Sequence, residues 1–192
     1  PDSFSDGGVF LSRENAIARA LQMAREGADI IDIGGESTRP GAQPVSVQEE
    51  MDRVIPVIEA LREKISLPVS IDTSKPEVMR AAVAAGAGFI NDVRALRDAG
   101  ALQAAASLRV PVCLMHMQGE PRSMQDNPRY YDVAADVADF LRARLQAARA
   151  AGIPPERLVI DPGFGFGKSL AHNIELLRGL RELKSLGAPI LA

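Results

Sequence analysis

The stretch Leu158–Ser169, LVIDPGFGFGKS, decides how the rest of the chain is interpreted. Its apolar start is typical of a strand buried on both faces, and it runs directly into Asp161, a proline and three alternating glycines. Such strands belong to parallel sheets covered by helices, where ligands bind beside the carboxyl ends of the strands. Asp161 is therefore a candidate ligand contact. The glycines would let backbone approach a flat or anionic ligand, and Phe164 and Phe166 offer a stacking face.

Strand and helix patterns alternate along the chain. Apolar runs predict six strands, at DIIDIGG, PVSIDT, FINDV, VPVCLM, LVID and APILA. No linker or low-complexity segment divides residues 1–192, so we expect a single α/β domain. The pattern fits a TIM (β/α)₈ barrel, incomplete in this chain and running roughly from the loop after strand 1 to strand 7. A doubly wound open sheet is the alternative, but no G-x-G-x-x-G follows the early strands and polar residues end nearly every strand.

Both ends of the chain look truncated. It opens at Pro1 in the loop-like PDSFSDGG and closes at APILA, in what reads as the middle of a strand. We therefore expect a part of a longer protein. Made alone, this part is expected to be inactive, because a sheet that lacks its first and last strands leaves two edges open.

Composition favours a small-molecule ligand. The 192 residues are 46% hydrophobic and 24% charged, with a net charge of −3 and no cluster of Lys or Arg, which argues against nucleic-acid or membrane-surface partners. The one cysteine, Cys113, excludes a disulfide framework. No apolar run approaches the length of a membrane span, and no charged-then-apolar leader opens the chain, so we expect a cytoplasmic protein.

Polar residues recur where the predicted strands end, and on a barrel these ends converge on one mouth. For any one of them a helix cap or a turn is an equally good interpretation, but the recurrence favours a site. Carboxylates accept hydrogen bonds and asparagine both donates and accepts, so the set suits a neutral ligand rich in N–H donors, such as an amino-pyrimidine ring. The residues are Asp32, Glu36, Asp72, Asn91, Asp92, His116 and Asp161.

Two segments raise the question of anion binding. In STRPG, Thr38 and Arg39 could meet an anion, and Pro40 stiffens the loop. GFGFGKS lacks the spacing of a phosphate-binding Walker loop, because Pro162 stands where the first glycine is needed. Its Lys168 is better interpreted, with the serine after it, as the start of the next helix.

Metal binding through histidine is disfavoured because the chain has only two histidines. A magnesium ion would instead use oxygen ligands and the phosphates of a substrate. Asp2, Asp6 or residues before Pro1 could contribute such ligands. His116 is equally well explained as a structural histidine bonded to backbone.

Read in order, PDSFSDGG, DIGGESTRPGA, SIDTSKPEVMRAA, GAGFINDV, PVCLMHMQGEP and IDPGFGFGKS closely resemble the bacterial dihydropteroate synthase family. The resemblance runs the length of the chain. It implies a TIM barrel enzyme of folate biosynthesis that condenses 6-hydroxymethyl-7,8-dihydropterin pyrophosphate with p-aminobenzoate, giving 7,8-dihydropteroate and pyrophosphate. It also implies assistance by Mg²⁺, a homodimer, and inhibition by sulfonamides.

The resemblance assigns roles to residues by their positions in these motifs. Asp72, Asn91 and Asp161 look like the residues that bind the pterin, and Met115 and Phe166 look like residues that pack near its ring. The implied chemistry is loss of pyrophosphate to leave a pterin-stabilised cation, which the aniline nitrogen captures while the carboxylates stabilise it.

A second group of residues looks like the surroundings of the pyrophosphate group and of p-aminobenzoate. Thr38 and Arg39 look like pyrophosphate-side contacts and, with Asp6, are the candidate catalytic residues. Phe4, Asp6 and Pro40 look like parts of two mobile loops that shape the p-aminobenzoate site. The family's metal-binding asparagine precedes the first residue here and its late Ser-Arg-Lys-Ser and Arg-x-His segments follow the last, so the metal ligands stay unknown.

Two other functions remain open at this point. A corrinoid-dependent, pterin-binding methyltransferase resembles the synthase in its barrel and in an Asp-Asn-Asp cradle. PDSFSDGG and ESTRPGA favour the synthase, because methyl transfer has no pyrophosphate or p-aminobenzoate to hold. A pterin-binding fragment without activity is the other possibility, and it would bind pterin without forming product.

Overall fold

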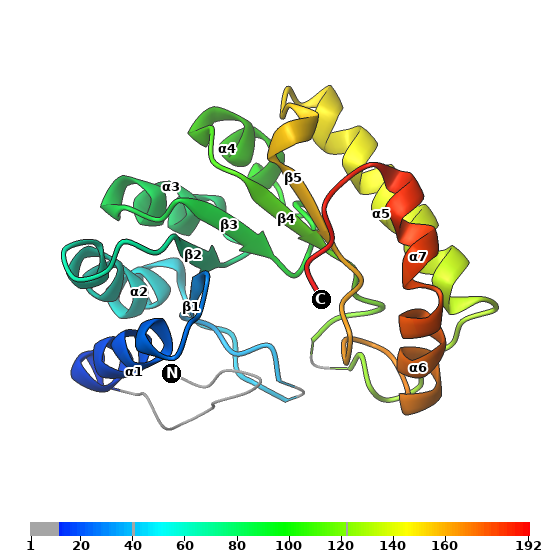
Figure 1. Ribbon diagram of the computed structural model, residues 1–192, viewed down its shortest axis with the longest axis horizontal. Helices are drawn as coiled ribbons and strands as arrows, with labels where there is room; N and C mark the ends of the chain where they lie inside the picture. Colours follow the sequence, from blue (N-terminus) through cyan, green and yellow to red (C-terminus); the bar gives the residue numbers. More distant parts are fainter. Residues whose placement is uncertain (1–11, 40, 122) are drawn as a thin grey trace.

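Strands and helices alternate in the computed structural model, which describes residues 12–39, 41–121 and 123–192 (Figure 1). The strands are β1 Ile31–Gly34, β2 Val69–Asp72, β3 Phe89–Asp92, β4 Val112–Met115 and β5 Leu158–Asp161. The helices are α1 Arg13–Arg25, α2 Val47–Arg62, α3 Pro76–Ala85, α4 Ala101–Leu108, α5 Val133–Ala150, α6 Leu170–Arg178 and α7 Leu180–Leu183, with short 3₁₀ turns η1 Pro155–Arg157 and η2 Lys184–Leu186. None of the helices in these ranges is long and apolar enough to cross a membrane.

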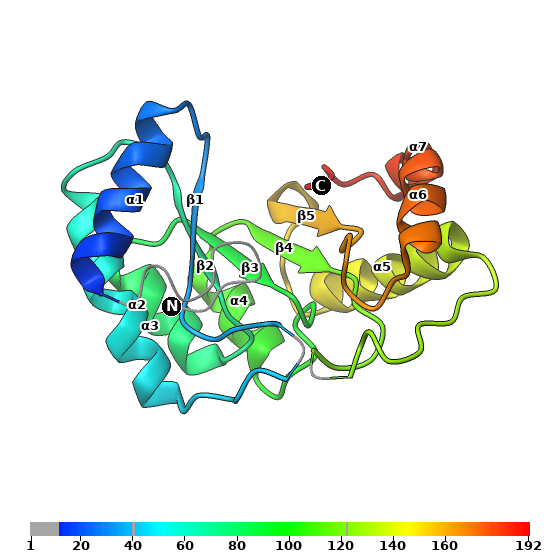
Figure 2. The same ribbon diagram turned by 90° about the horizontal axis from the view of Figure 1, so that it is seen from below.

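The five strands form one parallel sheet in the order of the chain, β1-β2-β3-β4-β5. Helices α2 to α5 lie along its convex side, and the concave side faces away from them (Figures 1 and 2). A sheet that always adds its next strand on the same side is built like a barrel wall, whereas a doubly wound sheet reverses direction at a switch point. The predicted α/β barrel architecture is confirmed, and the described strands do not close the barrel.

The sixth predicted strand, at APILA, is reduced in the structure to a single bridge. Ile190 forms an isolated parallel bridge with Ile160 of β5. Ile160 N donates to Pro189 O at 2.9 Å, and Leu191 N donates to Ile160 O at 2.9 Å. The prediction of a strand there was therefore too long, although its position beside β5 is the one that the barrel order requires.

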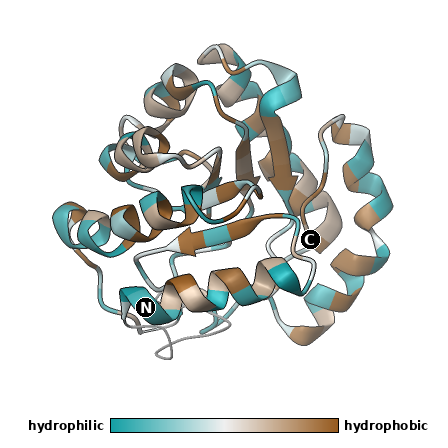
Figure 3. Cartoon of the chain, turned by 60° about the vertical axis from the view of Figure 1, so that its left-hand side comes forward, coloured by the Kyte–Doolittle hydropathy of each residue, from teal (hydrophilic) through white to brown (hydrophobic). Residues whose placement is uncertain are grey.

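The core lies between the sheet and its outer helices. Alternate strand residues point to this side, and Ile71, Ile90, Leu114 and Ile160 have no exposed surface. Burying each such side chain contributes about 1.5–3 kcal/mol. Figure 3 shows the strands as predominantly hydrophobic, while the helices carry hydrophobic and hydrophilic residues on different faces. The other set of alternate strand residues must then line the concave side.

Helix ends follow the signals in the sequence. The Ser46 hydroxyl accepts from Glu49 N at 3.1 Å and begins α2, and Ser169 forms a reciprocal capping box with His172 at the start of α6. The last predicted helix is divided in two at Gly179, which the sequence pattern did not indicate. A Cβ at Gly179 would lie 2.8 Å from that of Ala134 on α5, so the close approach of α6 to α5 requires glycine there.

Candidate active site

The carboxyl ends of the strands carry polar side chains on the concave face of the sheet. Strand register pairs Asp72 with Asn91, and Asn91 with Cys113. Two residues further along β4, Met115 pairs with Asp161. Because successive side chains of a strand alternate between its faces, all five residues lie on the same face. The structure therefore brings Asp72, Asn91 and Asp161 to one face and one end of the sheet, while their contact with a pterin stays a prediction.

Asn91 is oriented by a carboxylate from another strand. Its Nδ2 donates to Oδ2 of Asp32 on β1 at 3.1 Å. Its Oδ1 is buried and has no hydrogen-bond partner among the described residues. A buried amide oxygen without a donor costs free energy until a ligand supplies one. This unsatisfied acceptor marks the place where an N–H group of a ligand would be stabilised.

The carboxylates of this face are held where ionisation is costly. Burial is the main cause that raises the pKa of Asp72 well above its usual range, and the negative charge of Asp32 raises it further. Desolvation by the surrounding groups also raises the pKa of Asp32, although this residue keeps exposed surface, against the hydrogen bonds from Ser70 and Asn91. A ligand that presents N–H donors to these oxygens would satisfy them and lower both pKa values. The electrostatics thus favour a donor-rich or cationic ligand.

Asp161 is fixed by the glycine-rich loop that follows it. Gly163 N donates to Oδ1 of Asp161 at 2.6 Å, and His116 N donates to Asp161 O at 2.9 Å. Gly163 has a φ of +66°, and a Cβ there would lie 1.9 Å from the His116 carbonyl oxygen. Glycine is required for both reasons. One carboxylate oxygen is therefore committed to the loop, which leaves the other to accept from a ligand.

Met115 and Phe166, predicted to pack near a ring, lie in the same apolar cluster. Met115 is 3% exposed and belongs to a small cluster with Val93, Met117 and Met124, against which Phe166 packs while staying partly exposed. The cluster is separate from the main core. An apolar wall next to hydrogen-bonding groups is the usual composition of a small-molecule site.

Thr38 and Arg39 line a neighbouring cavity of about 340 Å³. Asp72 lines it as well, so the cavity adjoins the concave face of the sheet. Arg39 lies in a tight turn, in which its N donates to the Ser37 hydroxyl at 3.3 Å and its O accepts from Ala42 N at 3.1 Å. Both candidate anion contacts thus open into a space connected to the predicted pterin site.

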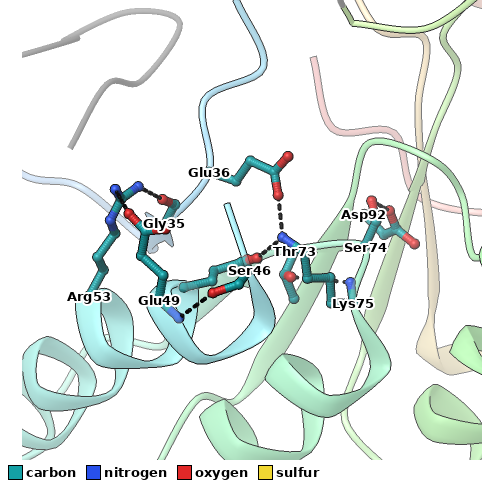
Figure 4. Close-up of polar contacts among 10 residues, drawn as sticks. Gly35, Glu36, Ser46, Glu49, Arg53, Thr73, Ser74, Lys75 and Asp92 are labelled. Carbon is teal, nitrogen blue, oxygen red and sulfur yellow. Dashed lines mark hydrogen bonds and ion pairs between the residues drawn. The ribbon is translucent and has the colours of Figure 1, made fainter. Parts of the chain in front are cut away.

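Lys75 anchors the base of the loop that carries these two residues. Its ammonium donates to the carboxylates of Glu36 and Glu50, and Figure 4 shows the Glu36 side chain extending toward it. Glu50 is 1% exposed, and a Cβ at Gly35 would lie 2.7 Å from its Cγ. Arg53 Nη1 also donates to Gly35 O at 2.8 Å. The chain at Gly35 and Glu36 is therefore tied to α2 and to the start of α3.

Two of the strand-end residues do not face the predicted site. Asp92 is fully buried on the helix side, where its carboxylate accepts from Arg94 N and Leu96 N, each at 2.8 Å. His116 packs edge-on against Phe140 of α5, with ring centroids 4.9 Å apart. Their expected convergence on the barrel mouth was wrong, because the residue that follows an inward-facing residue in a strand points outward. Both side chains instead contact other parts of the protein on the helix side of the sheet.

Lys168 is the residue whose role sequence analysis missed. It does not belong to the next helix but is 3% exposed, with Nζ donating to Gly163 O at 2.7 Å and to Phe166 O at 3.0 Å. Nζ also lies 2.9 Å from His116 Nδ1. The only signal in the sequence was a single lysine after alternating glycines, and sequence analysis assigned it to the start of the next helix.

The remaining predictions concern three loop residues, the cysteine and a metal ion. Phe4, Asp6 and Pro40 lie outside the described residues. Cys113 is fully buried, and burial raises the pKa of its thiol above the usual range, which disfavours a nucleophilic role. In the part of the chain that the structure describes, no group of three or more His, Cys, Asp or Glu residues could hold a metal ion.

Comparison with known proteins identifies the family. The family described as pterin binding enzymes matches residues 1–192. Dihydropteroate synthase of Escherichia coli is 52% identical over 191 residues, which cover 100% of this chain and 68% of that protein. The chain belongs to the dihydropteroate synthase family. Dihydropteroate synthase of Haemophilus influenzae is similarly related, at 53% identity over 100% of this chain and 70% of that protein.

Solved structures of dihydropteroate synthases share the fold. The Yersinia pestis synthase in a sulfonamide drug complex superposes with a TM-score of 0.95 at 52% identity, covering 99% of this chain and 69% of that one. The Xanthomonas albilineans synthase with 4-aminobenzoic acid gives a TM-score of 0.90 at 60% identity, covering 100% and 69%. The open sheet described above is therefore part of the TIM barrel of this family.

Proposed function

We propose that this chain carries the pterin site of a dihydropteroate synthase, which joins 6-hydroxymethyl-7,8-dihydropterin pyrophosphate to p-aminobenzoate and releases pyrophosphate. The main support is the inward row of Asp72, Asn91 and Asp161, with a buried acceptor at Asn91 Oδ1 that lacks a donor. An amino-pyrimidine ring offers a row of N–H donors to such acceptors. A synthase of Xanthomonas albilineans has been solved with 7,8-dihydropteroate, at 56% identity to this chain.

The roles of the residues follow from charge. As the bond between the pterin methylene carbon and the pyrophosphate oxygen breaks, the electron pair leaves with pyrophosphate and positive charge spreads over the pterin. Asp72 and Asp161, fixed at the edge of the ring, would stabilise that charge without reorganisation. The aniline nitrogen then forms the new C–N bond and loses a proton to solvent or pyrophosphate. Thr38 and Arg39, in the adjoining cavity, would bind the departing anion.

The proposal extends to Mg²⁺, although the described residues do not form a site for it by themselves. Mg²⁺ commonly keeps several waters and binds substrate phosphates with one or two protein oxygens. The ion would then be held chiefly by the pyrophosphate group. Titration with Mg²⁺ in the presence and absence of pyrophosphate tests this, and tight binding without pyrophosphate would contradict it.

A homodimer and a cytoplasmic location are also part of the proposal. Exposed apolar side chains on α6, Leu170 at 78% and Leu177 at 61%, provide surface of the kind that a subunit interface covers. Sedimentation of the full-length protein tests the dimer, and a monomer at micromolar concentration would contradict it. Cell fractionation tests the location.

The decisive experiment follows pyrophosphate release by the full-length protein. Release should require both the pterin pyrophosphate and p-aminobenzoate, and a sulfonamide should suppress it in competition with p-aminobenzoate. Pterin binding without release would favour a binding module. Absence of pterin binding would remove the proposal altogether. A methyltransferase is disfavoured because the Escherichia coli and Haemophilus influenzae proteins that match over the whole chain are synthases.

A further inference from the structure

Lys168 holds the two ends of one turn in the glycine-rich loop. Its three N–H bonds can point at three acceptors: Gly163 O at 2.7 Å, Phe166 O at 3.0 Å and His116 Nδ1 at 2.9 Å. The side chain is buried, at 3% exposure. A lysine whose donors are all satisfied inside the protein is fixed in one position.

The turn that Lys168 holds carries Phe166 and is hydrogen-bonded to Asp161, the two predicted pterin contacts of this region. Gly163 N donates to the carboxylate of Asp161 at 2.6 Å, and Phe166 N donates to Gly163 O at 3.1 Å. Any shift of Gly163 therefore moves the hydrogen bond that orients Asp161, and any shift of the Phe166 backbone moves its ring. The ammonium of Lys168 binds the carbonyls of both residues at once.

His116 joins this arrangement to the sheet. It directly follows Met115 at the end of β4, its backbone N donates to Asp161 O at 2.9 Å, and its ring rests on Phe140. Burial and the nearby charge of Lys168 lower the pKa of His116 to about 3. The ring is therefore neutral at physiological pH, and its Nδ1 can accept a hydrogen bond from the Lys168 ammonium. The contact spans 52 positions in the sequence.

We propose that Lys168 and His116 are positioning residues for the pterin, which fix the Gly163–Phe166 turn so that Asp161 and Phe166 face the ligand together. This inference rests on the proposed function, because it concerns the same pterin site. Neither residue touches the ligand in this arrangement; both act through the backbone of the loop.

The chemistry of Lys168 makes a purely stabilising role a poor explanation. Its hydrogen-bonding partners are uncharged, whereas Lys75 is paired with two carboxylates. Burying an ammonium among neutral partners is costly, and apolar replacements of buried charges are often neutral or stabilising. A methionine of similar length would fill the space but hold neither carbonyl. Stability and ligand affinity should therefore respond differently to its removal.

The test uses the full-length protein and 6-hydroxymethylpterin as the probe, with binding measured by calorimetry. Lys168→Met should weaken pterin binding about tenfold or more through lost hydrogen bonds to the loop. The substitution should leave the KM for p-aminobenzoate within about twofold of the parent value. The loss of pterin affinity should remain when the binding data are corrected for the fraction of the variant that is folded. Lys184→Met is the matched control, because Lys184 is an exposed lysine in η2, and it should bind like the parent protein.

Two substitutions of His116 separate positioning from packing. His116→Asn keeps an acceptor near Nδ1 and should retain pterin affinity within about threefold, whereas His116→Leu keeps the bulk but deletes the acceptor and should weaken binding about tenfold. Equal affinity for Lys168→Met and the parent protein would overturn the inference while leaving the proposed function intact. So would equal losses in the asparagine and leucine variants. If the parent protein itself does not bind the pterin, the proposed function fails first.

Discussion

Asn91 and Asp32, 59 positions apart in the sequence, meet across the concave face of the sheet through a hydrogen bond of 3.1 Å from Nδ2 to Oδ2. The bond fixes which way the Asn91 amide points. Its oxygen is thereby left as a buried acceptor without a partner in the described part of the chain. Asp32 thus orients a predicted pterin contact from two strands away, since β2 lies between β1 and β3.

Asp32→Ala should weaken binding of 6-hydroxymethylpterin about tenfold, because the Asn91 amide is then free to rotate and present the wrong group. Asp32→Asn keeps an acceptor oxygen and should lose less. Asp29→Ala removes an exposed carboxylate three residues earlier and serves as the control. Calorimetric affinities of the three variants decide the matter, and an unchanged affinity in Asp32→Ala would show that Asn91 is oriented by something else.

Asp161→Asn should also weaken pterin binding, by about 1.5–3 kcal/mol, the value of a charge-assisted hydrogen bond. The amide oxygen would keep the bond from Gly163 N, which turns the NH₂ group toward the donors of the ligand. Asp139→Asn on the exposed face of α5 is the matched control. Parent-like affinity in Asp161→Asn would exclude Asp161 from the site.

Much of the site could be predicted from the sequence, and what could not depends on contacts between distant positions. The apolar runs and caps predicted the alternation of strands and helices, and strand periodicity explains why Asp72 and Asn91 share a face. Periodicity alone could not decide whether Asn91 or its neighbour Asp92 points inward. The burial of Lys168 was also unpredictable, because its partner His116 lies 52 positions away. The sequence gives no sign that Glu50 of α2 is buried, because its partner Lys75 lies 25 positions further along the chain.

Gly163→Ala should destabilise the protein more than Gly152→Ala. Both glycines have positive φ, so each alanine variant carries a similar backbone strain of about 1–2 kcal/mol. At Gly152 a Cβ would meet nothing within 4 Å, whereas at Gly163 it would lie 1.9 Å from the His116 oxygen. We expect an additional loss of about 1–3 kcal/mol at Gly163. Urea unfolding of both variants measures this, and equal midpoints would contradict the close approach.

Lys75→Met should lower the free energy of unfolding by about 2–3 kcal/mol, somewhat less than for a fully buried pair because Lys75 keeps some exposure. The loss arises because Glu50, at 1% exposure, keeps a buried carboxylate without its cation. Adding Glu50→Gln to the same chain removes that charge and should restore part of the stability. A double variant no more stable than Lys75→Met would show that the pair is not energetically coupled.

The pH dependence of stability should reveal the state of Lys168. Burial lowers its pKa from 10.5 to about 7, against the opposing charge of Asp161. Between pH 7 and 10 the unfolded chain therefore binds a proton that the folded chain does not, so stability rises with pH across this window. As pH falls from 10 to 7 this gain is lost, and below pH 7 Lys168 adds no further pH dependence because both states are protonated. His116, the other titratable group that faces it, stays neutral there because its pKa is about 3.

Unfolding of the parent protein and of Lys168→Met, measured at several pH values, isolates this effect because other titrating groups are common to both. The parent should gain stability relative to the variant by up to about 1.4 kcal/mol per pH unit from pH 7 to 10. A difference that stays constant over this range would mean that Lys168 remains fully charged in the fold. The three acceptors around its ammonium would then offset burial completely, and the positioning role would be carried by a permanent cation.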